Sequence, residues 1–220
     1  MDKTDKLRLR FEKTGRAVYI SHLDLMATMQ RAFARAELPL KYSEGFNPHP
    51  LISILLPLSV GTASVCELMD FRLREETILT TLPERLTNAL PEGIRVLEVW
   101  PSDRKSAQLK WLRVSGLLEY DHGAPALEAL EAFFGQESIV IEKKTKRGMG
   151  ESDIRPAVRE ISFRMEGENL RLEAVISAQE PTLNPDLLVS ALRQLRPELA
   201  PDFAEFTRLE TYDSEMQIYR

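Results

Sequence analysis

The sequence predicts an α+β protein built from two tandem ferredoxin-like units, each with an antiparallel sheet and the order βαββαβ. Three observations support this prediction. Segments in which apolar and polar residues alternate are interspersed with segments of helical spacing. Their order in residues 1–100 is strand, helix, strand, strand, helix, strand, and similar segments recur in residues 106–220. The stretch between them, Pro-Ser-Asp-Arg-Lys, is typical of a linker between domains of about 100 residues.

The first unit contains six segments in this order. The expected strands are Leu7–Phe11, Leu51–Leu58, Glu67–Arg74 and Ile94–Trp100, and the expected helices are Ser21–Glu37 and Ile78–Leu90. Ser21 and Asp24 form a capping-box pattern, because a serine oxygen accepts a helix N–H and a carboxylate in the first turn complements the helix dipole. Pro83 is expected near the start of the second helix, where proline is tolerated.

The second unit has the same kinds of segment plus an extra strand or long loop. The expected strands are Gln108–Tyr120, Ser138–Thr145, Val158–Met165, Asn169–Ser177 and Thr207–Tyr212, and the expected helices are Ala126–Phe134 and Pro185–Leu195. Two of these strands, Val158–Met165 and Asn169–Ser177, are expected to form a hairpin across Glu166 and Gly167, because glycine suits a tight turn.

Composition limits the classes of function. The net charge of −5 argues against a wholly basic surface for bulk nucleic-acid binding, but it allows a local basic site. Cys66 is the only cysteine, which excludes an internal disulfide and any all-cysteine zinc or iron–sulfur site. The charged N-terminus lacks the apolar core of a signal peptide, and no apolar segment approaches the ~20 residues that span a bilayer. We therefore expect a cytoplasmic protein with no membrane partner, no bound metal and no cofactor.

The segment Lys41–Gly61 is the first candidate site, because its prolines and glycines give a loop a fixed shape. The residues expected to form a pocket or docking loop are Tyr42, Gly45, Phe46, Asn47, Pro48 and Pro50. The alternative is a loop that only connects two elements.

Three residues are candidates for catalysis or metal binding: His22, Asp24 and His49. The alternative is that Asp24 caps the helix and both histidines are solvated. A helix from Ser21 to Glu37 would be about 25 Å long, so the histidines meet only if the following loop runs back along the sheet.

A basic segment in the second unit is the third candidate site. Its cations are Lys143, Lys144, Lys146, Arg147 and Arg155, and they surround two glycines in an otherwise acidic chain. Cations on a hairpin suit a phosphate backbone, because their binding releases counterions. Arg155, before Pro156, is suited to a bidentate contact. The alternative is a solvated loop that protects an edge strand from aggregation.

Several strings resemble the radical-SAM-linked family of uncharacterised bacterial domains, and the resemblance extends from about Leu7 to about Ser177. They are Ser-His-Leu-Asp-Leu at 21–25, Tyr-Ser-Glu-Gly-Phe-Asn-Pro-His-Pro at 42–50, Leu-Pro-Leu-Ser-Val-Gly at 56–61 and Ser-Asp-Ile-Arg-Pro at 152–156. Members are found fused to, or encoded beside, radical SAM proteins. The resemblance therefore implies a radical SAM protein as partner. This chain departs from the family at Leu51, where a lysine is common.

The residues contain no self-sufficient catalytic motif: there is no P-loop, dinucleotide fingerprint, HExxH or nucleophile elbow. One cysteine cannot provide the three ligands of a radical SAM cluster. The leading hypothesis is a non-catalytic module that presents a substrate, structured RNA, to a separate radical SAM enzyme. One alternative is an RNA-processing or RNA-modifying enzyme that uses His22 and His49. The other is a protein-interaction adaptor that binds no nucleic acid.

Overall fold

The computed structural model describes residues 5–145 and 148–220, and they form an α+β protein with antiparallel sheets. The chain divides into two compact units, Met1–Ser106 with Arg220, and Ala107–Tyr219. None of the helices in the described part has the length and apolar character that crossing a membrane requires.

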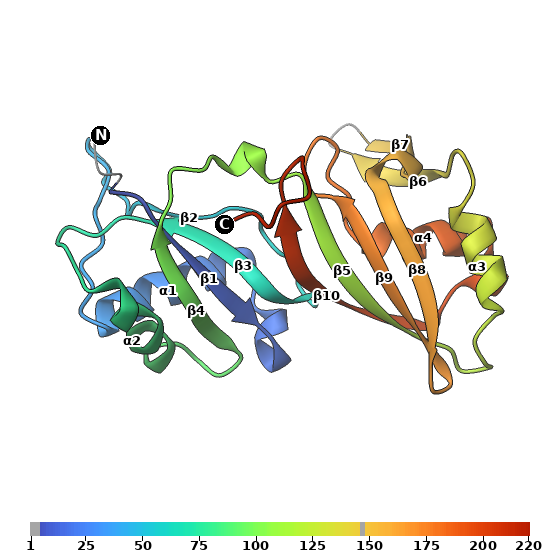
Figure 1. Ribbon diagram of the computed structural model, residues 1–220, viewed down its shortest axis with the longest axis horizontal. Helices are drawn as coiled ribbons and strands as arrows, with labels where there is room; N and C mark the ends of the chain where they lie inside the picture. Colours follow the sequence, from blue (N-terminus) through green and yellow to red (C-terminus); the bar gives the residue numbers. More distant parts are fainter. Residues whose placement is uncertain (1–4, 146–147) are drawn as a thin grey trace. The chain divides into compact units, whose positions relative to one another are not determined.

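The first unit has four strands and two main helices in the expected order (Figure 1). They are β1 (Leu7–Lys13), α1 (His22–Arg35), β2 (Ile52–Ile54), β3 (Ala63–Phe71), α2 (Leu82–Asn88) and β4 (Ile94–Pro101). Short 3-10 helices precede α1 and α2, at Gly15–Tyr19 (η1) and Leu79–Thr81 (η2), and Ser106–Gln108 (η3) follows β4. The strands lie in the order β4-β1-β3-β2, and each neighbouring pair is antiparallel.

Both helices of the first unit pack on one face of its sheet. In the strand register Leu9 lies opposite Met69, and Phe11 lies opposite Val96, so these side chains share a face. They form one buried cluster with residues from both helices, among them Leu25, Met29, Phe33, Leu82 and Leu86. The apolar stripe predicted for the first helix is therefore the buried face of α1.

The predicted ends of α1 are confirmed to within two residues. Ser21 is the N-cap, and its Oγ accepts a hydrogen bond from the Asp24 backbone N–H at 3.2 Å. The Ser21 hydroxyl also donates to the Asp24 carboxylate at 2.7 Å. At the other end Glu37 has φ +53° and the Leu38 N–H bonds to the Phe33 carbonyl at 2.9 Å, a left-handed C-terminal cap.

Two strand predictions in the first unit were wrong at their boundaries. The expected strand Leu51–Leu58 is only Ile52–Ile54, an edge strand that ends before Pro57, since proline has no N–H for a ladder. The expected connection Val60–Cys66 is strand from Ala63 onward, because β3 begins there. The helix expected at Ile78–Leu90 is divided into a 3-10 turn and α2, with Pro83 in the first turn of α2.

The described residues of the second unit form six strands and two main helices. They are β5 (Trp111–Glu119), α3 (Leu127–Phe134), β6 (Val140–Thr145), β7 (Gly148–Asp153), β8 (Val158–Glu166), β9 (Asn169–Ser177), α4 (Asp186–Leu195) and β10 (Phe203–Tyr212). The 3-10 helices are Arg155–Ala157 (η4) and Pro197–Leu199 (η5). Four strands pair antiparallel in the order β10-β5-β9-β8, and β6 and β7 form a separate two-stranded sheet.

The predicted hairpin of the second unit is confirmed, since β8 and β9 pair across Glu166 to Asn169 and Gly167 has φ +65°. The strand β7 was not expected as a strand, and it pairs with β6. Phe134 of α3 stacks on Phe163 of β8 with ring centroids 5.7 Å apart, which joins the helix to the sheet.

Candidate functional site

The two histidines proposed for catalysis lie at opposite ends of the first unit. His22 is the first residue of α1, and the preceding Ile20 accepts a hydrogen bond from Lys13 at the end of β1. His49 lines a pocket together with Lys6, next to the start of β1. The seven residues of β1 span about 20 Å between these ends. The structure therefore does not bring His22 and His49 together.

The third candidate, Asp24, is engaged in the cap of α1 through both its backbone and its carboxylate. Within residues 5–145 and 148–220, no three His, Cys, Asp or Glu side chains form a group that could hold a metal ion. Cys66 is buried in β3.

Backbone hydrogen bonds fix the base of the loop between α1 and β2. The Lys41 N–H bonds to the Arg72 carbonyl at 2.8 Å, and the Leu51 N–H bonds to the Lys41 carbonyl at 2.8 Å. Tyr42 and Pro50 form an isolated antiparallel bridge above these bonds. The loop thus leaves the sheet as a short two-stranded ladder.

Ser43 and His49 close this ladder below the tip of the loop. The Ser43 N–H bonds to the His49 carbonyl at 2.8 Å, and the His49 N–H bonds to Ser43 Oγ at 3.1 Å. The same Oγ lies 2.9 Å from His49 Nδ1. His49 is therefore a structural partner of Ser43. The first and last residues of the Ser-Glu-Gly-Phe-Asn-Pro-His string bond to each other and so fix the conformation of the loop.

Phe46 stands at the tip of the loop with its side chain fully exposed, at 112% relative accessibility. Gly45 before it has φ +117°, which only glycine adopts without strain. Burial of a phenylalanine side chain contributes about 1.5–3 kcal/mol, and this loop forgoes that stabilisation. Phe46 is therefore an exposed aromatic side chain on a loop whose base is fixed by hydrogen bonds, which leaves it available for contact with a ligand.

Cations surround the base of the loop. The guanidinium of Arg74 lies 5.5 Å from the centre of the Tyr42 ring, within range of a cation–π contact. Asp5 pairs with Lys41 at 3.0 Å and with Arg72 at 3.3 Å. The Lys41 hydrogen bond is the main cause that lowers the pKa of Asp5. These partners come from segments far away in the sequence, so sequence reasoning did not find them.

A buried ion pair lies beside the loop. Arg8, fully buried, donates to both carboxylate oxygens of Asp70, from Nε at 2.6 Å and from Nη2 at 3.1 Å. Its Nη2 also donates to the Arg104 carbonyl at 2.9 Å, as does Lys6 Nζ at the same distance. Alternation of apolar and basic residues over Leu7–Phe11 is typical of a strand with one buried face, but Arg8, on the other face, is buried as well. The residues that follow β4 contribute to covering it.

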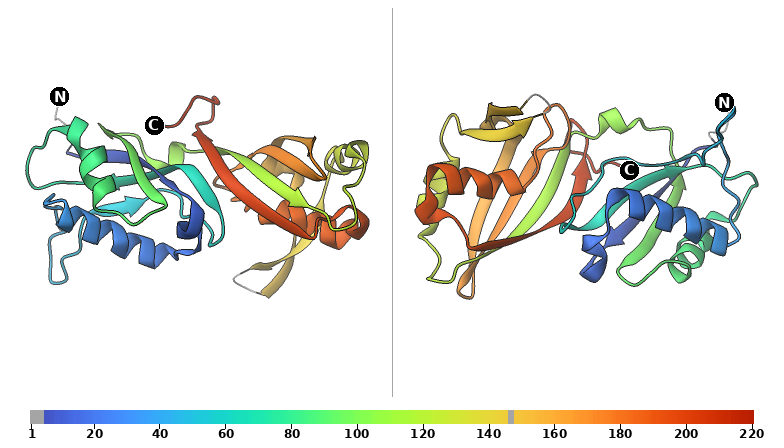
Figure 2. Two further views of the ribbon diagram at one scale, coloured as in Figure 1. Left: turned by 90° about the horizontal axis from the view of Figure 1, so that it is seen from below. Right: turned by 180° about the vertical axis from the view of Figure 1, so that it is seen from behind.

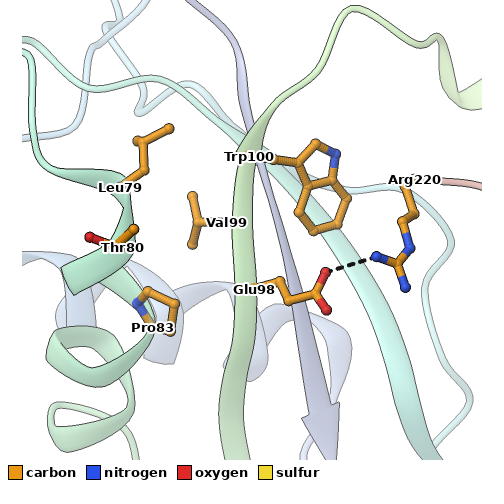
Figure 3. A pocket seen from close by; sticks show the side chains of 7 residues that line it. All are labelled: Leu79, Thr80, Pro83, Glu98, Val99, Trp100 and Arg220. Atoms are coloured by element: carbon orange, nitrogen blue, oxygen red, sulfur yellow. Dashed lines mark hydrogen bonds and ion pairs between the residues drawn. The ribbon is translucent and has the colours of Figure 1, made fainter.

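The pockets on the first unit include one beside the loop and one beside α2. One, of 310 Å³, lies next to the loop and is lined by Lys6, His49, Pro50, Ser53, Asp70 and Arg72, among others. The other, of 430 Å³, lies between the start of α2 and β4, and a pair between Glu98 and Arg220 at 3.2 Å forms its polar edge (Figure 3). None of the predicted site residues lines the second pocket.

The basic segment of the second unit forms the hairpin of β6 and β7, which stands apart from the four-stranded sheet (Figure 2). Lys143 and Lys144 lie in β6, opposite Gly150 and Met149. The predicted cations Lys146 and Arg147 lie outside the described residues. The side-chain amide of Gln194 in α4 bonds to both the N–H and the carbonyl of Glu142, at 2.9 and 3.0 Å, and so anchors the outer edge of the hairpin.

Arg155 is held by backbone carbonyls in this structure. Its Nε donates to the Gln136 carbonyl at 3.1 Å, and its Nη1 donates to the Val158 carbonyl at 2.6 Å. These bonds join the end of α3 to the start of β8. The guanidinium of Arg155 thus already has two backbone partners. A bidentate contact with a phosphate, as expected from the sequence, would compete with these partners for its N–H groups.

Asp153 closes the base of the hairpin. Its Oδ1 accepts the N–H groups of Ile139 and Arg155, each at 2.9 Å, and these two bonds are the main causes that lower the pKa of Asp153. The Ser-Asp-Ile-Arg-Pro string therefore has a structural explanation: Asp153 makes a turn, Ile154 is buried and Arg155 ties two loops.

This arrangement predicts a pH dependence for the hairpin. Because the folded pKa of Asp153 is lower than its ordinary value of 3.8, its stabilising effect is present above that value and is lost as the pH falls through the folded pKa. The base of the hairpin in the wild type should therefore open in acid. Asp153→Asn should weaken the base at neutral pH and should remove this dependence on pH. Hydrogen exchange of the Ile139 and Arg155 amides across this range measures it. Amides equally protected in both proteins at neutral pH would contradict it.

Comparisons with known proteins place the chain in a family and indicate its fold. A family model described as "Uncharacterized protein conserved in bacteria (DUF2344)" matches residues 6–185. The chain is also similar to a chain in the crystal structure of a Cbf5-Nop10-Gar1 complex, with a TM-score of 0.51 and 12% identity. The similarity covers 93% of this chain and 48% of that chain, so this chain spans about half the length of its structural neighbour.

A second solved structure, described as an unknown protein from Galdieria sulphuraria, is 11% identical, with 93% of this chain and 98% of that chain covered. Its TM-score of 0.27 is too low to carry a structural argument. Comparison with curated proteins gives no match.

Proposed function

The chain belongs to the bacterial family DUF2344, and we propose that it is a non-catalytic RNA-binding module that serves a separate radical SAM enzyme. The observation that carries this proposal is the β6–β7 hairpin, a two-stranded arm that includes two of the clustered lysines. The radical SAM partner and the cytoplasmic location are inferred from the sequence resemblance and composition described above.

We further propose that both units are ferredoxin-like. The first unit has the order β4-β1-β3-β2 with both helices on one face. The second unit has the corresponding order β10-β5-β9-β8 when the β6–β7 hairpin is treated as an insertion between α3 and β8. On this interpretation the hairpin is the element that the second unit adds to a shared scaffold, which favours a functional role for it.

A non-catalytic role agrees with the geometry of the candidate residues. His22 and His49 lie about the length of β1 apart, Asp24 caps α1, and Cys66 is buried. General acid–base catalysis needs the reacting groups within hydrogen-bond reach of one substrate. No observation in the described part of the chain favours the enzymatic alternative that uses these histidines.

An accessory module also needs a surface for its enzyme. Three exposed apolar side chains lie near the start of α1: Tyr19, Leu23 and Val60, at 70%, 78% and 58% relative accessibility. The turn that contains Val60 is bonded to the segment before α1, because the Gly61 N–H donates to the Val18 carbonyl at 2.9 Å. Leu23 and Val60 belong to two of the strings that resemble the radical-SAM-linked family, and Tyr19 lies just before the first of them.

The proposal predicts salt-dependent binding of RNA through the hairpin. We expect Lys143→Gln with Lys144→Gln to weaken binding and to reduce the slope of log affinity against log salt by about 1.4, since each phosphate contact to a single strand contributes roughly 0.7. Fluorescence anisotropy of a labelled oligouridylate between about 50 and about 200 mM salt measures this slope.

Arg159→Gln with Arg164→Gln is the matched control, because it removes two exposed cations from β8 of the same unit. It should leave the slope nearly unchanged. Wild-type affinity that does not depend on salt would sink the RNA-binding proposal. A tagged pull-down at near-physiological salt then tests the partner: recovery of a radical SAM protein without RNA would favour the adaptor alternative.

A further inference from the structure

The exposed tip of the α1–β2 loop is organised in a way that points to a specific ligand. Phe46 is fully exposed, whereas the residues below it are fixed by three contacts between Ser43 and His49. The ring therefore stands clear of the protein on a support of defined geometry. Because the base of the loop is already ordered, binding at the ring loses less conformational entropy than it would on a disordered loop.

The neighbourhood of Phe46 is aromatic and cationic rather than purely apolar. Tyr42, on the same loop, is half exposed and lies beside the Arg74 guanidinium at 5.5 Å. Lys41 and Arg72 flank the loop, but both pair with Asp5, and Glu44 lies in the loop itself. The positive charge is thus largely balanced, so electrostatic attraction contributes less here than at the hairpin.

We propose that Phe46 stacks on an unpaired base of RNA, which makes the loop a reader of single-stranded segments, bulges or loops. This inference rests on the proposed RNA-binding function and names the substrate class within it. A base offers a flat face to the Phe46 ring, and stacking of this kind is tolerant of sequence because every base has such a face. The ring carries no charge, so its own contact releases no counterions. A base inside a duplex has no free face, so duplex RNA is excluded from this site.

The pocket next to the loop can receive the nucleotide that adjoins the stacked base. It has a volume of 310 Å³, and its lining includes Lys6, Arg72 and His49 with the exposed edge residue Ser53. Lys6 pairs there with Asp70, which also lines the pocket, at 3.3 Å, and Arg72 pairs with Asp5, so the pocket offers polar side chains without an excess of positive charge. The histidine and serine suit a base edge or a ribose hydroxyl.

Substitutions of Phe46 separate stacking from general apolar contact. We expect Phe46→Ala to weaken binding of an oligouridylate by about tenfold. Phe46→Leu should weaken the binding nearly as much. Leucine keeps much of the apolar area, but it has no π-face on which a base can stack. Phe46→Trp should keep the affinity, and its indole emission should be quenched on binding. The loss in Phe46→Ala should be the same factor at low and high salt, unlike the loss at the hairpin.

Phe203→Ala is the matched control, since it removes another exposed phenylalanine side chain, at the start of β10 in the second unit. It should leave affinity unchanged. Ser43 is a positioning residue: Ser43→Ala should weaken binding only partly, and Ser43→Thr should restore it, because threonine keeps the hydroxyl. Circular dichroism confirms that each variant is folded.

Three outcomes would overturn the inference. If the wild type binds RNA but Phe46→Ala binds equally well, the stacking site is wrong while the proposed function stands. If Phe46→Leu matches the wild type, or if the oligonucleotide annealed to its complement binds as well as the single strand, the ligand is not an unpaired base. If the wild type binds no RNA at all, the proposed function and this inference both fail, and Phe46 belongs to a protein interface.

Discussion

Replacement of Asp70 with alanine is expected to destabilise the first unit by about 3 kcal/mol, because it leaves a buried guanidinium without its carboxylate. Arg8 is fully buried, and Asp70 is its bidentate partner at 2.6 and 3.1 Å. Lys6 also pairs with Asp70 at 3.3 Å, so the substitution leaves two cations close together. An unpaired charge is most destabilising where water cannot reach it.

The pair of Arg95 and Glu12 provides the control for this prediction. It is also bidentate, at 2.8 and 3.2 Å, and it joins two strands of the same sheet, but the Arg95 side chain is 60% exposed. Glu12→Ala should therefore have a far smaller effect, since solvent screens an exposed pair. Urea unfolding followed by Trp100 emission, in a background with Trp111→Phe, reports on the first unit. Equal losses in the two variants would contradict the role of burial.

Substitution of Gly93 with alanine should lower the free energy of unfolding of the first unit by about 2–5 kcal/mol. Gly93 has φ +87°, where an alanine is strained by about 1–2 kcal/mol. Its Cβ would also lie 2.5 Å from the Thr14 carbonyl oxygen and 2.9 Å from Ala17 Cβ, and overpacking of this kind costs about 1–3 kcal/mol. The Thr14 N–H bonds to the Gly93 carbonyl at 2.8 Å, so the two backbones cannot move apart without losing that bond.

Gly61→Ala separates strain from crowding. Gly61 has φ +88°, almost the same as Gly93, but no heavy atom lies within 4 Å of the position of its Cβ. This variant should lose only the strain, about 1–2 kcal/mol. The same Trp100 unfolding experiment compares the two. If both alanine variants lose the same free energy of unfolding, the Thr14 carbonyl does not crowd the position of a Cβ at residue 93.

The sequence predicted those elements in which local signals agree with the tertiary environment. Helix α1 was predicted nearly to the residue, because its capping serine, its apolar stripe and its terminal turn all act within a few residues. The start of β3 was missed for the opposite reason. In the missed residues the buried side chains are Ser64 and Cys66, whereas the less buried ones, Ala63 and Val65, are apolar, so the sequence lacks the alternation of apolar inside and polar outside that marks a strand.

The same distinction applies to the candidate sites. The residues of the α1–β2 loop were identified from their proline and glycine content, which is a local property. Their supports were not, because Asp5, Arg72 and Arg74 reach the loop only through the fold. Arg155 was assigned to phosphate from its charge alone, whereas its carbonyl partners, Gln136 and Val158, could be known only from the structure.

The caps of α1 give the first unit an uneven tolerance of changes in length. Ser21 fixes where the helix begins, and the left-handed turn at Glu37 fixes where it ends. Each residue added between them would rotate everything downstream by about 100° about the helix axis and advance it by about 1.5 Å. The direction in which Phe46 points is therefore set by the phase of a helix that ends well before it. Insertions at the exposed residues Glu75 and Glu76, between β3 and η2, carry no such penalty, so natural length variation should be concentrated there and absent from α1.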